Sequence, residues 1–117
     1  MNLRAIRGAI QVGANSPEEI ASGVKELLPA ILEANSLKAE DVISVLLTCT
    51  PDLNAAFPAA YAREIGFGAI PLLCAVEMDV PGALPLVIRV MLHVQMDRQA
   101  SHVYLRGAIS LRKDLAQ

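Results

Sequence analysis

Residues 87–96 read VIRVMLHVQM, and this stretch decides the class of the fold. Every second residue from Ile88 to Met96 is apolar, whereas Arg89 and His93 fall on the alternate positions. An alternation with a period of two residues is typical of a β-strand that has one face in the core. The stretch therefore predicts a strand, with Arg89 on the face opposite to the fully apolar one.

Four further segments have strand patterns. Residues 2–12 alternate in the same way, with Arg7 on a face of small apolar side chains. Residues 42–49 form a continuous apolar run, which predicts a buried strand, and strands are also expected at residues 69–76 and 103–110. With two intervening helices, the order β-α-β-α-β-β-β predicts an α/β or α+β fold, in which a mixed five-stranded sheet is flanked by helices.

The first helix has a recognisable beginning. Ser16 can cap it, Pro17 suits its first position, and Glu19 is expected to close a capping box. Apolar residues at helical spacing continue the pattern to about residue 35. Pro29 removes one backbone donor within this helix, so a kink is expected.

The second helix is shorter. It is expected at residues 58–65, where Pro58 suits the first turn and Gly66 suits the end. A loop begins at Pro81-Gly82, and residues 83–86 are expected to add a short helical turn.

Length and composition limit the classes of protein. A chain of 117 residues, 54% of them hydrophobic, is expected to form a single domain over residues 1–117 and to associate into an oligomer. The net charge of −2 and the dispersed basic residues argue against a nucleic-acid partner, and no apolar stretch is long enough for a membrane span. Without signal-peptide features, and with Cys49 and Cys74 isolated, a reduced cytoplasmic protein is expected.

The motifs of most enzyme classes are missing. The sequence has no GxGxxG, Walker lysine or HExxH motif, so no cofactor is expected. His93 and His102 fall in different predicted strands, so no metal is expected either. Cys74 has no identifiable base beside it and is more simply a small core residue than a nucleophile.

Arginines in apolar surroundings are the remaining candidates for chemistry. Arg89 lies among aliphatic residues and needs a buried or interfacial partner, for which Glu77 is available at the end of an apolar strand. If Arg7 and Arg63 converge on Arg89, a single Glu77 cannot neutralise them. Surplus guanidinium charge favours a site for a small anion, particularly a dicarboxylate.

Several fragments resemble one family. In chain order they are Arg4–Ala9, Thr50–Leu53, Phe57–Ala59, Cys74–Val80, Ile88–Met91 and His102–Leu105. Together they resemble the monofunctional chorismate mutases of the trimeric α/β class. The resemblance implies a homotrimer that forms a pseudo-α/β barrel, with active sites at its subunit interfaces. It also implies conversion of chorismate to prephenate in aromatic amino-acid biosynthesis. That intramolecular Claisen rearrangement needs no nucleophile, metal or cofactor, only a bound conformer and stabilised charge.

The resemblance also implies roles for individual residues. Arg89 is expected against the ether oxygen, Glu77 is expected to hold Arg89 and accept from the substrate hydroxyl, and Arg7 is expected to bind a carboxylate beside Tyr104. Where members of the family can carry a lysine at the entrance, this chain has Ala60. The other implied substrate-binding residues are Arg63 and Arg112 at the entrance and, along an apolar wall, Phe57, Ala59, Leu72, Leu73, Cys74 and Leu111.

Two other functions fit the same architecture. Small trimeric barrels such as imine and enamine deaminases also place arginines in interfacial clefts, and a non-catalytic trimer could bind a small anion. Glu77 in combination with Arg89 and Tyr104 favours the chorismate mutases over the deaminases. Tight binding of a dicarboxylate without turnover would favour the binding module.

Overall fold

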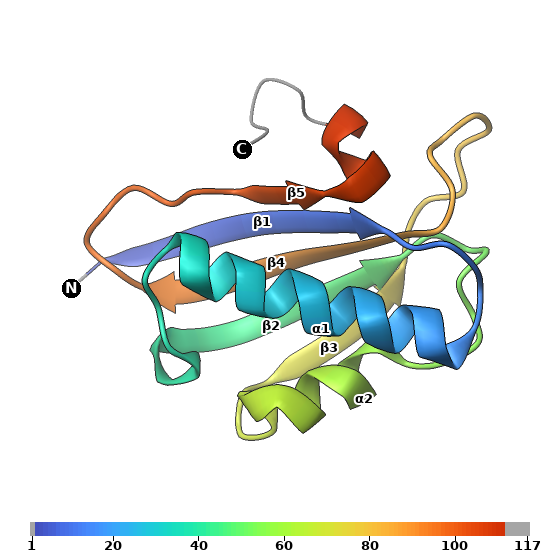
Figure 1. The fold of residues 1–117 in the computed structure, drawn as a ribbon. Coiled ribbons are helices and arrows are strands. Elements are labelled where there is room, and N and C mark those ends of the chain that lie inside the picture. The colour runs from blue at the N-terminus through green and yellow to red at the C-terminus, as the bar shows by residue number, and fades with distance from the viewer. Residues whose placement is uncertain (1, 112–117) are drawn as a thin grey trace.

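The computed structural model describes residues 2–111, in which five strands form one mixed sheet (Figure 1). The order across the sheet is β3-β2-β4-β1-β5. The central strand β4 is antiparallel to both of its neighbours, whereas the two edge strands run parallel to theirs. The strand bounds are β1 (Leu3–Gln11), β2 (Val42–Cys49), β3 (Leu72–Val76), β4 (Val87–Gln95) and β5 (Val103–Leu105). The expected mixed five-stranded sheet of an α+β fold is confirmed.

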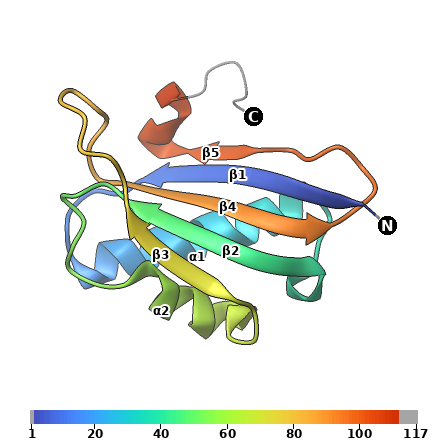
Figure 2. The same ribbon diagram turned by 180° about the vertical axis from the view of Figure 1, so that it is seen from behind.

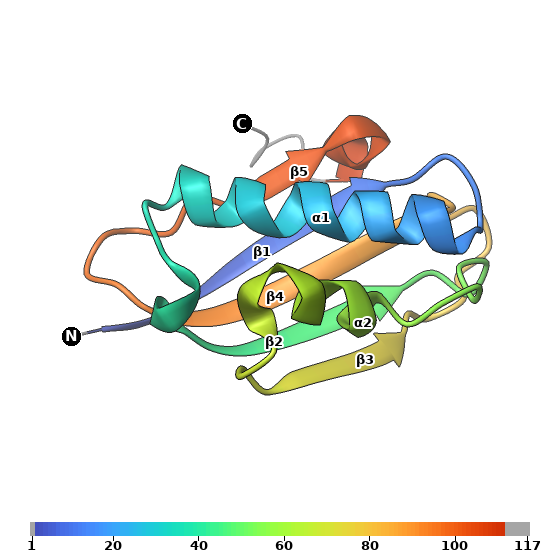
Figure 3. The same cartoon turned by 60° about the horizontal axis from the view of Figure 1, so that its bottom comes forward.

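Two α-helices cover one face of this sheet (Figure 3). They are α1 (Pro17–Ala34) and α2 (Pro58–Ala62), and the core lies between them and the sheet. No helix in the described part of the chain is long and apolar enough to cross a membrane. The sheet contributes residues such as Ile6, Ile10, Ile88 and Leu92 to this core, and the buried apolar stripe of α1 consists of Ile20, Val24, Leu27, Leu28 and Ile31.

The beginning of α1 follows the expectation only in part. Ser16 Oγ accepts a hydrogen bond from Glu19 N at 3.1 Å, so the predicted cap is confirmed. The predicted capping box is wrong, because Glu19 Oε1 accepts from Gly13 N at 2.8 Å, in the loop before the helix. Beyond this first turn, α1 runs through Pro29 to Ala34 as one helix.

The second helix ends near the predicted residue. Regular α-helix stops at Ala62, and a wider turn spans Arg63–Phe67. Gly66 has a φ of 104° there, a left-handed conformation that glycine adopts without strain. The strand expected from residue 69 begins only at Leu72.

Two expectations about the second half of the chain are wrong. Residues 83–86 form no helical turn: Leu86 has a φ of 58°, and its N–H donates to Asp52 Oδ2 at 3.1 Å rather than to a helical carbonyl. The strand expected at residues 103–110 ends at Leu105. Arg106 has a φ of 54°, which turns the chain into the 3₁₀ helix η3 (Arg106–Leu111).

The second face of the sheet is open (Figure 2). Among residues 2–111 no α-helix lies on it, and η3 covers one end, where Ala108 packs with Ala9 and Val87. Leu46 of β2 is 40% exposed on this face and Leu73 of β3 is 62% exposed. The expectation that β2 is a buried strand is therefore wrong for the half of its side chains that face away from the helices.

Candidate active site

One row of side chains crosses the open face of the sheet. Residues paired in register on neighbouring strands point to the same face, so one row takes a residue from each strand. The row reads Ala75, Thr48, Arg89, Ala9 and Tyr104 from β3 to β5. Ala9 lies between Arg89 and Tyr104 in this row, so the backbones of Arg89 and Tyr104 are two strand spacings, about 10 Å, apart.

Arg89 is held through one nitrogen only. Its Nε donates to Glu77 Oε1 at 3.1 Å, and Thr48 Oγ1 donates to Oε2 of the same carboxylate at 2.8 Å. The side chain of Glu77 is 17% exposed, and that of Arg89 is 44% exposed. Among residues 2–111, all hydrogen bonds of the Arg89 guanidinium pass through Nε. Its two terminal nitrogens are therefore available to a ligand on the open face.

Arg7 lies on the same face, one row away. Arg7 pairs with Met91 and Ala9 pairs with Arg89, so the two arginines are diagonal neighbours across β1 and β4. A hollow of about 300 Å³ is lined by both arginines together with Thr48 and Tyr104. Two guanidinium groups and the single Glu77 carboxylate leave surplus positive charge, so the hollow suits an anion.

His102 fixes the backbone of Arg7. Its Nδ1 accepts a hydrogen bond from Arg7 N at 3.0 Å, just before the three-residue strand β5 begins. The imidazole thereby continues the bonding between β1 and the edge strand that carries Tyr104. This contact gives His102 a structural partner on β1, in a place where sequence reasoning weighed it only as a metal ligand.

A second hollow, of about 450 Å³, lies against Arg89 on its Glu77 side. Leu111, the last described residue, lines it and packs against the buried cluster that includes Tyr104. Arg89 lines both hollows. Arg112, predicted at the entrance, lies outside the described residues.

The other predicted residues belong to the opposite layer. Leu72 and Cys74 alternate with Leu73 along β3 and pack against the core below the helices. Ala59 is buried within α2. Phe57, just before α2, is 75% exposed, and Arg63 at the end of α2 is exposed as well. The structure therefore joins Arg7, Glu77, Arg89, Tyr104, Leu73 and Leu111 on the open face and leaves Phe57, Ala59 and Arg63 apart from them.

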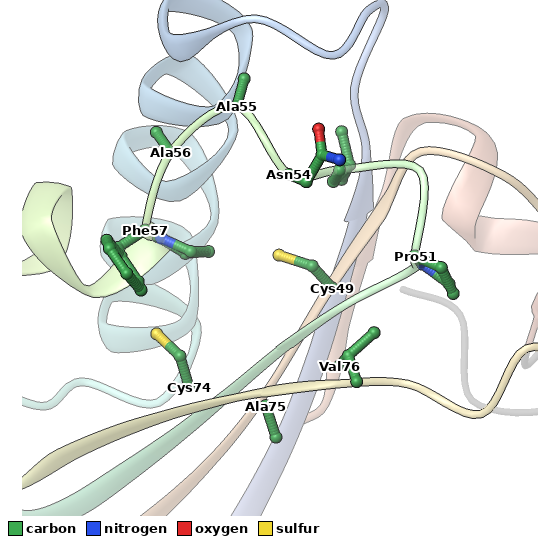
Figure 4. Close-up of a pocket in the computed structure, with 11 residues that line it drawn as sticks. Cys49, Pro51, Asn54, Ala55, Ala56, Phe57, Cys74, Ala75 and Val76 are labelled. Carbon is green, nitrogen blue, oxygen red and sulfur yellow. The ribbon is translucent and has the colours of Figure 1, made fainter.

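A third hollow, of about 510 Å³, lies on the helix side and is mainly apolar (Figure 4). Cys49 and Cys74 line it together with Phe57. Burial raises the pKa of Cys49 to about 12, with Cys74, Glu77 and Asp52 acting in the same direction, so this thiol stays protonated at neutral pH. A protonated buried thiol packs as a small apolar group and is a poor nucleophile.

Two further findings concern the chemistry of the site. Among the described residues, no group of three or more His, Cys, Asp or Glu side chains comes together to hold a metal ion. Thr48 was missed by sequence reasoning, although a hydroxyl directly after Val45, Leu46 and Leu47 in an apolar strand is a visible signal. Its link to Glu77 depends on the register of three strands, which alternation within one strand does not give.

Comparison with known proteins points in one direction. The family model described as chorismate mutase type I matches residues 3–115. The chain is 48% identical over 120 residues to chorismate mutase AroH of Bacillus subtilis, covering 99% of this chain and 94% of that protein. It is 48% identical over 117 residues to chorismate mutase AroH of Thermus thermophilus, covering 97% and 96%. A solved chorismate mutase from Clostridium thermocellum matches with a TM-score of 0.89 at 45% identity, covering 92% of this chain and 98% of that chain.

Proposed function

This chain belongs to the chorismate mutase type I family, and from that membership we propose how the open sheet face carries out its reaction. The protein is a chorismate mutase, an isomerase of aromatic amino-acid biosynthesis that takes chorismate to prephenate. The alternative of an imine or enamine deaminase is set aside, since the named relatives are all chorismate mutases. We place the enzyme in the cytoplasm, where the free thiols of Cys49 and Cys74 stay reduced.

One observation carries the proposed mechanism: Arg89 is bound to Glu77 through Nε, which leaves its terminal nitrogens to the ligand. In the rearrangement the ether C–O bond breaks while a C–C bond forms within the same molecule. Negative charge grows on the ether oxygen as that bond breaks. The terminal N–H groups of Arg89 donate to this oxygen, and the interaction strengthens toward the transition state, which is the condition for lowering the barrier.

Arg7 and Tyr104 select the reactive conformer. The guanidinium of Arg7 binds one substrate carboxylate from the row next to Arg89. The hollow of about 300 Å³ that Arg7, Arg89 and Tyr104 line leaves room for a compact substrate. Holding the two reacting ends together removes much of the entropic part of the barrier. Glu77, besides orienting Arg89, accepts from the substrate hydroxyl.

The site is shared between subunits of a homotrimer. Leu46 and Leu73 leave apolar surface around the arginines, and such a surface on a small domain needs a cover. The exposed Phe57 of a neighbouring subunit supplies it, with the exposed Arg63 at the entrance. The separation of the predicted residues onto two layers of one chain supports this arrangement. Three such interfaces close the single-domain subunits into a pseudo-α/β barrel.

Paired arginine variants test the mechanism. Arg89→Lys keeps a positive charge but cannot donate to Glu77 and to the ether oxygen in the guanidinium geometry. We expect kcat to fall by about 10²- to 10³-fold, as for the loss of one transition-state donor. Arg63→Lys, at the entrance, is the matched control and is expected to change KM more than kcat. Both are measured by the loss of chorismate absorbance.

Two results would contradict the proposal. If Arg89→Lys kept the wild-type kcat, Arg89 would not meet the charge that develops in the transition state. If a folded wild-type trimer bound dicarboxylates but consumed no chorismate, the chain would be an anion-binding module. Light scattering and circular dichroism on each variant separate these results from loss of assembly or of fold.

A further inference from the structure

We propose that Thr48 is a positioning residue for this reaction, an inference that rests on the function proposed above. Its hydroxyl donates to Glu77 Oε2 at 2.8 Å, while Arg89 Nε donates to Glu77 Oε1 at 3.1 Å. The single proton of the Thr48 hydroxyl is therefore directed to Glu77 and not to a ligand. Thr48 sets the rotation of the Glu77 carboxylate, and the carboxylate in turn sets the orientation of Arg89.

The backbone around this contact is well anchored. Thr48 lies in the middle of β2, paired with Arg89 on one side and with Ala75 on the other. Glu77 follows β3 directly, and its N–H donates to Cys49 O at 2.9 Å. With both backbones fixed by the sheet, the remaining freedom lies in the side-chain torsions of Glu77, which orient its carboxylate. The Thr48 hydroxyl removes that freedom.

The contact from Thr48 is important because Arg89 and Glu77 could otherwise pair in a different geometry. Arginine and a carboxylate commonly pair through two parallel hydrogen bonds, using two guanidinium nitrogens. A Glu77 carboxylate free to rotate would take up a terminal nitrogen of Arg89 in addition to Nε. That nitrogen would then no longer be free to donate to the ether oxygen. By occupying Oε2 from the β2 side, Thr48 keeps the pairing with Arg89 to one bond.

The predicted signature is a fall in kcat with little change in KM. An interaction made only in the transition state affects kcat and kcat/KM together when it is lost. Thr48→Val keeps the shape of the side chain and removes the hydroxyl. We expect it to lower kcat by about 10-fold, the size typical of losing a hydrogen bond to a charged group. Thr48→Ser keeps the hydroxyl and is expected to retain a kcat close to that of the wild type.

A double-mutant cycle tests the route of the effect. Because Thr48 acts through Glu77, adding Thr48→Val to a Glu77→Ala enzyme should change kcat no further. The role of Thr48 is overturned if Thr48→Val keeps the wild-type kcat, if Thr48→Ser is impaired as much as Thr48→Val, or if the two changes are additive in the cycle.

The controls separate this proposal from the one it rests on. If the wild-type trimer does not consume chorismate, the proposed function fails and the role of Thr48 fails with it. If the wild type and Thr48→Val are equally active, only the role of Thr48 is wrong. Light scattering on each variant shows whether the trimer is retained.

Discussion

At the scale of single residues, the site depends on Glu77, whose two carboxylate oxygens both accept hydrogen bonds. Oε1 accepts from Arg89 and Oε2 accepts from Thr48. The carboxylate is mostly buried against the sheet, so its charge is weakly screened there. It stabilises a cation at Arg89 while restricting how that cation can turn. Charge and orientation are thus both supplied by one side chain.

Removing only the charge of Glu77 tests this claim. Glu77→Gln keeps the shape of the side chain, and we expect kcat to fall about 10²-fold because Arg89 loses its ionic partner. Glu33→Gln is the matched control, since Glu33 is exposed near the end of α1 and has no part in the proposed site. Steady-state kinetics on both variants give the answer. Unchanged turnover in Glu77→Gln would show that the charge is dispensable.

Sequence reasoning reached most of this site but not all of it. Alternation in residues 87–96 placed Arg89 away from the fully apolar face, and charges in apolar surroundings singled out Arg7 and Glu77. The family resemblance added Tyr104 and the role of each residue. Thr48 stayed out of reach because its role needs the register between strands that are some 40 positions apart in the chain. Period and composition within one strand carry no information on register with a distant strand.

At the scale of helices and strands, the close packing of α1 on the sheet depends on two glycines. A Cβ at Gly23 of α1 would lie 2.6 Å from Val12 Cγ1 and 3.2 Å from Ile88 Cδ1. A Cβ at Gly8 of β1 would lie 2.6 Å from Ile31 Cδ1. These two glycines therefore let the helix approach the strand that carries Arg7 on its other face.

The substitution Gly23→Ala has two opposing effects on the free energy of unfolding. Alanine raises helix propensity by about 1 kcal/mol. Overpacking against Val12 costs about 1–3 kcal/mol, which is the larger effect, so we expect the free energy of unfolding to decrease. The double variant Gly23→Ala/Val12→Ala relieves the clash and is expected to recover part of the loss. Urea denaturation at a fixed protein concentration measures both, and a single variant more stable than the wild type would contradict the packing account.

Helices and strands were predicted well where the periodicity of apolar residues alone defines them. They were predicted poorly where a contact with a residue far away in the chain determines the local backbone. Leu86 and Arg106 have left-handed φ values of 58° and 54°, which are unusual for residues with side chains. Leu86 N is held by Asp52, and Arg106 donates to Glu26 Oε1 of α1 at 2.6 Å. Such contacts join residues far apart in the chain, so the local sequence at 83–86 and 103–110 could not reveal them.

At the scale of the whole molecule, the sheet has one face under helices and one open face (Figure 2). The residues expected in one active site fall on both sides of it. The composition predicted more apolar surface than one subunit can bury. It could not indicate which apolar surfaces would contact each other in an oligomer. Phe57 is exposed on one layer and the arginines lie on the other, and the proposed trimer would bring them together between subunits.

Mixing two inactive variants tests this shared site most directly. Arg89→Ala disables the sheet half, and Phe57→Asp places a carboxylate against the dianionic substrate in the helix half. Each homotrimer is expected to be nearly inactive in the chorismate assay. Light scattering and co-purification through a tag on one variant identify the mixed trimers. Random mixing leaves about a quarter of the interfaces with both intact halves, so we predict recovery of activity on that order. Mixed trimers that recover no activity would contradict a site built from two subunits.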